Sequence, residues 1–74
     1  MVEVFKTNVR ARRHARQLLA QIHHDFQDYR ASFDLEDCDR ILRVESPGAF
    51  IPPAGLIQLL REAGFHAEVL PDES

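Results

Sequence analysis

The residues with the clearest capacity for binding chemistry are cationic and lie in one short stretch, V-R-A-R-R-H-A-R, which ends at Arg16. Its charged and titratable members are Arg10, Arg12, Arg13, His14 and Arg16. Apolar residues recur at helical spacing after this stretch and predict a helix from about Ala11 to His24 or Phe26. Because the start of a helix carries partial positive charge, arginines there do not stabilise it. The stretch is therefore expected to meet negative charge.

An acidic segment later in the chain offers one source of that negative charge. Residues 34–39 read D-L-E-D-C-D, and their acids are Asp34, Glu36, Asp37 and Asp39. One alternative is ion pairing within a single molecule, where each exposed pair contributes only about 0 to 1 kcal/mol. A second is that the arginines and the free N–H groups of the helix start bind phosphate, carboxylate or an acidic partner surface. A third is association of the basic stretch of one molecule with the acidic segment of another.

Histidine and cysteine side chains supply a second candidate chemistry, metal binding. Imidazole and thiolate together suit zinc, and three protein ligands with a water molecule form an acceptable coordination set. The candidate ligands are His14, Cys38 and His66, which are distant in sequence, so the set depends on the fold. The alternative is two exposed histidines and a cysteine in a turn. His23 and His24 lie toward the predicted helix end, where the dipole favours an imidazolium, and are interpreted as favourable end charges.

Catalysis is not indicated by any residue pattern. Cys38 lies between Asp37 and Asp39, and this like charge disfavours the reactive thiolate. No serine–histidine–acid set or phosphate-binding loop is evident. We expect a protein that is not an enzyme.

Length and composition predict one small domain. The chain has 74 residues, 45% of them hydrophobic, and a single cysteine that cannot form an internal disulfide. No apolar run is long enough to span a bilayer, and Glu3, Lys6 and Asn8 interrupt any signal-peptide core. The net charge of −3 argues against a general nucleic-acid binder. We expect a cytoplasmic protein, monomeric or weakly dimeric, with neither nucleic-acid nor membrane partners.

The remaining pattern predicts the elements that position these residues. Strands are expected at 2–7, 29–35, 40–45 and 65–70, and a second helix is expected between Pro52 and Gly64. Asn8 ends the first strand and is expected to cap the first helix. The order predicts a ferredoxin-like βαββαβ sandwich of the α+β class over residues 1–70, with a polar tail at 71–74. Both helices should cover one face of a four-stranded antiparallel sheet, and the basic stretch, the acidic segment and His66 should share one end.

The chain also resembles the heavy-metal-associated domain of small copper chaperones and metal-transporting ATPases, over nearly its whole length. The matching segments are Asn8-Val9-Arg10-Ala11-Arg12-Arg13-His14 after the first strand, Leu18 four residues after His14, Phe26-Gln27-Asp28-Tyr29, Ala31-Ser32-Phe33-Asp34-Leu35-Glu36 and Gly64-Phe65-His66-Ala67. The family carries Gly-Met-x-Cys-x-x-Cys at the first of these. Its two cysteines fall here on Ala11 and His14, and alanine cannot ligate a metal.

Two functional hypotheses follow. The resemblance implies a small non-enzymatic binding module linked to metal-ion binding or trafficking, without the Cys-x-x-Cys site, in which His14, Cys38 and His66 would hold zinc or copper. The alternative is a metal-independent domain that binds a protein with an acidic surface, or an anion, through the turn at residues 10–16. Its contacts would be Arg10, Arg12, Arg13 and Arg16.

Overall fold

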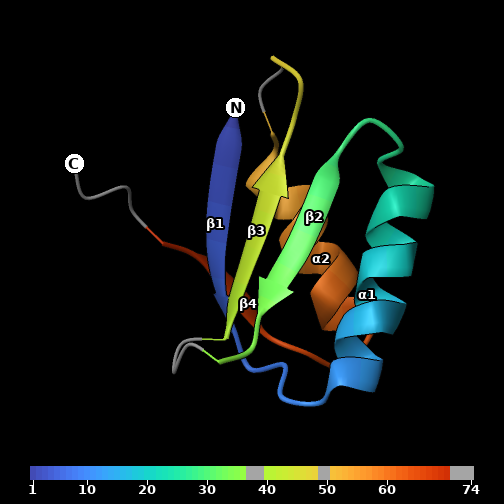
Figure 1. The fold of residues 1–74 in the computed structure, drawn as a ribbon, viewed down its shortest axis with the longest axis vertical. Helices are drawn as coiled ribbons and strands as arrows, with labels where there is room; N and C mark the ends of the chain where they lie inside the picture. The colour runs from blue at the N-terminus through green and yellow to red at the C-terminus, as the bar shows by residue number, and fades with distance from the viewer. Residues whose placement is uncertain (37–39, 49–50, 71–74) are drawn as a thin grey trace.

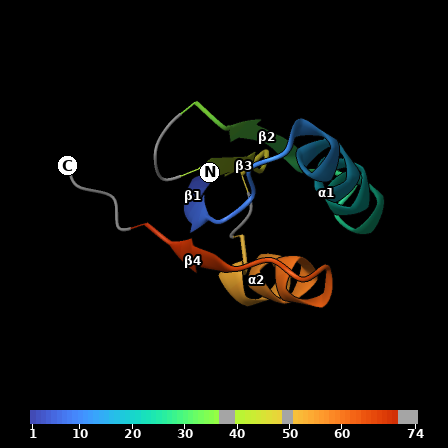
Figure 2. The same cartoon turned by 90° about the horizontal axis from the view of Figure 1, so that it is seen from below.

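The computed structural model describes residues 1–36, 40–48 and 51–70, and these residues form four strands and two helices. The elements in chain order are β1 (Val2–Thr7), α1 (Arg12–Asp25), β2 (Arg30–Asp34), β3 (Ile41–Glu45), α2 (Pro53–Glu62) and β4 (Ala67–Val69). The strands form one antiparallel sheet in the order β2-β3-β1-β4. Both helices lie on the same side of that sheet (Figures 1 and 2). The predicted ferredoxin-like α+β sandwich is confirmed.

The core lies between the helices and one face of the sheet. Cross-strand pairing places Phe5 opposite Leu42 and Leu42 opposite Phe33, so alternate residues of three strands share that face. Leu18 and Ile22 of α1 are buried against it. The buried apolar side chains are Phe5, Val9, Ala15, Leu18, Ile22, Leu42, Val44, Ile51, Leu56, Leu59, Leu60 and Ala67. Burial of a large apolar side chain stabilises the fold by about 1.5–3 kcal/mol, so this set fixes which side of each helix faces the sheet.

The end of α2 is closed by the glycine that the sequence predicts there. Gly64 has a left-handed backbone with φ of 93°, which glycine adopts without a steric penalty. The Gly64 N–H donates to the carbonyl of Arg61 at 3.0 Å, and the Phe65 N–H donates to that of Leu60 at 2.8 Å. This pair of bonds is a Schellman motif. It holds Phe65 in the turn, and the last strand therefore starts only at Ala67, later than predicted.

Of the two predictions for helix starts, one is confirmed and the other is wrong. Pro53 is the first residue of α2, as the double proline predicts. The expected cap of the first helix by Asn8 is wrong: α1 begins at Arg12, and its N-cap residue Ala11 makes no side-chain capping bond. The Asn8 Oδ1 atom instead accepts a hydrogen bond from the His66 N–H at 2.8 Å. Asn8 thus joins two connections that are distant in sequence.

Three connections meet at one end of the sheet, the lower end in Figure 1. Between β1–α1 and α2–β4, the Asn8 N–H donates to the His66 carbonyl at 3.3 Å. Between β1 and the β2–β3 connection, the buried Thr7 hydroxyl donates to the Arg40 carbonyl at 2.6 Å and accepts from the Val9 N–H at 3.3 Å. The predicted meeting of these connections is confirmed for the described residues. Asp37, Cys38, Asp39 and the tail at 71–74 lie outside the described residues.

Loss of the Thr7 hydroxyl should destabilise this end of the fold. Thr7→Val leaves the Arg40 carbonyl and the Val9 N–H without their partner, which should lower the free energy of unfolding by about 1–3 kcal/mol in urea titration. Thr7→Ser keeps the hydroxyl and is the matched control. Equal stability of the Thr7→Val variant and the wild type would contradict this role.

Candidate functional site

The arginines of the basic stretch are displayed on the surface. Arg10 precedes α1, whereas Arg12, Arg13 and Arg16 lie in its first turns, and all four side chains are exposed. Within residues 1–36, 40–48 and 51–70 none of the four forms a hydrogen bond or an ion pair. The first turn of α1 contains no acidic residue. Pairing within the molecule, the first alternative from the sequence, is therefore not found with the described acids Asp34 and Glu36.

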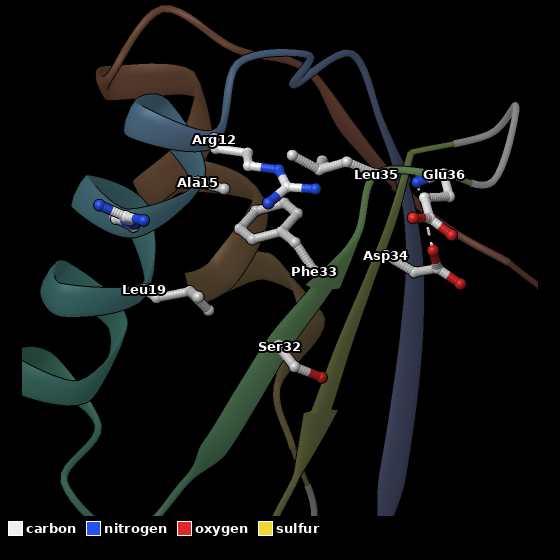
Figure 3. A pocket seen from close by; sticks show the side chains of 9 residues that line it. Arg12, Ala15, Leu19, Ser32, Phe33, Asp34, Leu35 and Glu36 are labelled. Atoms are coloured by element: carbon white, nitrogen blue, oxygen red, sulfur yellow. Dashed lines mark hydrogen bonds between the residues drawn. The ribbon is translucent and has the colours of Figure 1, made fainter.

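Two of these arginines border a groove between α1 and β2. Arg12 and Arg16 are four residues apart and so lie on the same side of the helix. The groove has a volume of about 450 Å³, and its lining residues are Arg12, Ala15, Arg16, Leu19, Ser32, Phe33, Asp34, Leu35 and Glu36. Figure 3 shows the Arg12 side chain extending from α1 toward Phe33 and Leu35. The groove therefore has an apolar floor with cationic groups along its helical wall.

The acids at the end of β2 do not neutralise that wall by direct contact. The Asp34 Oδ1 atom accepts a hydrogen bond from the Glu36 N–H at 3.3 Å. Both carboxylates point away from Arg12, on the far side of Leu35 (Figure 3). The Leu35 carbonyl is in turn bound by the Arg40 guanidinium. These contacts shape the end of the hairpin, and among the described residues no carboxylate pairs with the Arg12 guanidinium.

Two of the predicted metal ligands, His14 and His66, are described by the structure, and their contacts differ. The half-buried His14 ring lies against the Phe65 ring, with 5.2 Å between centroids and 53° between planes. His66 is exposed, and its Nε2 atom lies 3.9 Å from Glu68 Oε2. In the part of the chain that the structure describes, no three His, Cys, Asp or Glu side chains gather where they would hold a metal ion. Because Cys38 lies outside that part, the set His14, Cys38 and His66 stays a prediction.

His23 links α1 to β2, a role that the sequence does not indicate. The sequence predicts that His23 and His24 place favourable charge near the end of α1, and both residues lie in its last turn. In addition, the Nε2 atom of His23 accepts a hydrogen bond from the Ala31 N–H at 3.2 Å. The histidine therefore fastens the end of α1 to the start of β2. The sequence carries no local signal for this bond, because its two residues belong to different elements.

Comparisons with protein-family models, with curated proteins and with solved structures found no match for this chain. The resemblance to the heavy-metal-associated domain thus rests on the motif positions in the sequence. Within the described residues, neither helix has the length and apolar character needed to cross a membrane.

The ring contact of His14 predicts a measurable role in stability. His14→Ala should lower the free energy of unfolding by about 0.5–1.5 kcal/mol, because it removes the aromatic contact with Phe65. His66→Ala is the control, since that side chain is exposed and should change stability by no more than about 0.5 kcal/mol. Urea denaturation of both variants measures the difference.

The same two variants test the metal prediction independently. The set His14, Cys38 and His66 predicts a one-to-one zinc or copper(I) adduct in native mass spectrometry under reducing conditions. That adduct should disappear in His14→Ala, His66→Ala and Cys38→Ala. A wild-type protein that takes up neither metal at micromolar concentration would refute the predicted set.

Proposed function

We propose that this chain is a small non-enzymatic binding module that recognises a carboxylate-bearing surface of another protein. The contacts are made by the basic turn, defined as residues 10–16, through Arg10, Arg12, Arg13 and Arg16. On this view the chain uses a scaffold similar to the heavy-metal-associated domain for a task that needs no metal. The observation that carries the proposal is the set of exposed arginines without any partner among the described residues.

The chemistry of arginine supports a carboxylate as the target. A guanidinium presents its N–H donors in a planar fork that matches the two oxygens of a carboxylate. Arg12 and Arg16 border a groove with apolar residues on its floor, where a bound carboxylate would lose part of its contact with water. Charge-assisted hydrogen bonds strengthen when water is excluded in this way.

The cost of placing arginines in this turn gives further support. Positive side chains at a helix start oppose the helix dipole, and like charges four residues apart repel each other. Arg12 lies in the first turn and is four residues from Arg16, so it experiences both effects, and α1 has neither an acidic residue in its first turn nor a side-chain cap. An acidic partner would offset both unfavourable terms. The free protein should therefore be less stable because of the residues that serve binding.

Reversal of the charges at Arg12 and Arg16 should raise the stability of the protein and weaken its binding to an acidic partner. Arg12→Glu/Arg16→Glu places an acid in the first turn of α1 at position 12, and this replacement should raise the free energy of unfolding by about 0.3–1 kcal/mol. Position 16 lies beyond the first turn, where the helix dipole has little effect. The affinity for polyglutamate, measured by fluorescence anisotropy, should instead fall at least about tenfold. In the wild type that affinity should weaken with added salt, because salt screens exposed charges.

A matched control variant makes the same charge reversal at two arginines outside the basic turn. Arg43 is exposed on β3, and Arg61 is exposed in the last turn of α2. Arg43→Glu/Arg61→Glu changes the net charge equally and should bind polyglutamate much more strongly than the variant of the basic turn. Equal losses in the two variants would reduce the interaction to net charge and refute a site at the turn. Wild-type binding of inorganic phosphate but not of polyglutamate would redirect the proposal from proteins to small anions.

A further inference from the structure

The outer edge of β2 faces no other described strand. Among the described strands, β2 is terminal in the sheet and pairs with β3 alone. Because the Ala31 N–H donates to His23 on α1, the backbone groups of Ala31 point away from β3. In an antiparallel pair this direction alternates, so the N–H and C=O groups of Phe33 also point outward. Phe33 thus offers one donor and one acceptor at an open edge.

His23 limits this open edge to one end of the strand. Its imidazole already occupies the Ala31 N–H, at the end of β2 next to the last turn of α1. The other end, at Phe33 and Leu35, lies beside the first turns of α1 and the groove. The residues of α1 that follow this edge are Arg12, Arg16, Leu19 and His23, at spacings of four, three and four. The free backbone groups therefore lie next to the two arginines.

A strand added to this edge would contact both the outward backbone groups of Phe33 and the groove that Arg12 and Arg16 border. Residues directly opposite each other in a sheet have side chains on the same face. A residue opposite Phe33 would therefore direct its side chain to the helix side, where Arg12, Arg16 and Leu19 border the groove. Successive side chains on that side are two residues apart. An acidic residue near the arginines and an apolar residue two positions away would meet the cationic wall and the apolar floor.

We propose that the partner binds as an extended segment that adds a strand to the free edge of β2 beside Phe33. Side chains of this segment that face α1 alternate between an acidic residue, held by Arg12 and Arg16, and apolar residues against Leu19 and Phe33. The proposal rests on the proposed function and names the form in which the acidic partner is recognised. Strand addition is a common mode of peptide recognition, in which backbone bonds supply affinity and side-chain pockets supply specificity.

A second copy of this chain fits the edge less well. If two β2 strands paired with each other, the side chains facing α1 would be those of Ala31 and Phe33. Neither is acidic, and the carboxylate of Asp34 belongs to the opposite face of the sheet. Such a pair would bring Arg12 and Arg16 no counter-charge from the β2 residues of the second copy that face α1. Charge complementarity therefore selects a different segment as the occupant.

The test uses a labelled peptide of sequence T-V-T-E-T-V-T, which presents one glutamate flanked by valines on a single face in either strand direction. Its affinity is measured by fluorescence anisotropy. The wild type should bind it at least about tenfold more tightly than the same peptide with lysine in place of glutamate. Arg12→Glu/Arg16→Glu should lose that preference. Arg43→Glu/Arg61→Glu, an equal charge change outside the basic turn and the groove, should retain it.

Backbone methylation of the peptide tests strand addition separately. One peptide carries N-methyl groups on its valines and glutamate, and a second carries them on the threonines. In an added strand only one of these two sets of N–H groups faces β2, so one peptide should bind at least about tenfold more weakly and the other should bind almost normally. The affected set also identifies the strand direction, since antiparallel addition uses the residues opposite Phe33.

The outcomes distinguish the two proposals. If glutamate and the groove arginines matter but neither methylation does, strand addition is refuted and the proposed function stands. Absence of peptide binding at millimolar concentration, with retained binding of polyglutamate, has the same meaning. If the Arg12→Glu/Arg16→Glu variant binds both the peptide and polyglutamate as the wild type does, the proposed function fails as well. Concentration-dependent dimerisation that is lost when the edge is blocked by Phe33→Pro, in a variant that remains folded, would replace the peptide by a second copy.

Discussion

The burial of Leu18 and Ile22 in the core sets the rotation of α1 about its own axis. These residues are four apart, so together they define the side of the helix that faces the sheet. The neighbouring side, with Arg12, Arg16, Leu19 and His23, then follows the edge of β2. If α1 turned about its axis, Leu18 would become exposed and the arginines would leave the groove. The placement of the candidate binding surface thus depends on the same packing that holds the fold together.

Stability and binding place opposite demands on the first turn of α1. A stable helix start favours a side-chain cap and acidic residues, and this helix has neither. Packing of α1 against the sheet and the bonds of Thr7 and Asn8 at its N-terminal connection compensate for that weakness. The helix can therefore carry an arginine-rich start that local helix energetics alone disfavours. In the proposed function, a bound carboxylate offsets the unfavourable interactions of these arginines with the helix dipole and with each other.

The fold was largely predictable because its elements follow from local patterns. Alternation in β1, helical spacing in α1, the proline at the start of α2 and the glycine at its end each act over a few residues. What the sequence did not indicate depends on residues that meet only in the folded chain. The sequence predicts a helix cap at Asn8, but the Asn8 side chain accepts a hydrogen bond from the His66 N–H. It predicts a favourable end charge at His23, whose ring also accepts a hydrogen bond from the Ala31 N–H. The arginines were identified from their spacing, whereas the groove that Arg12 and Arg16 border requires the packing of α1 beside β2.

Amide hydrogen exchange of the free protein shows whether β2 has a free outer edge beside the groove that Arg12 and Arg16 border. The Ser32 and Asp34 backbone groups face β3, whereas those of Phe33 face outward. We predict that the Phe33 amide exchanges at least about tenfold faster than those of Ser32 and Asp34, because no described residue accepts a hydrogen bond from it. Equal protection of all three amides would show that the edge is already occupied and would contradict strand addition at β2.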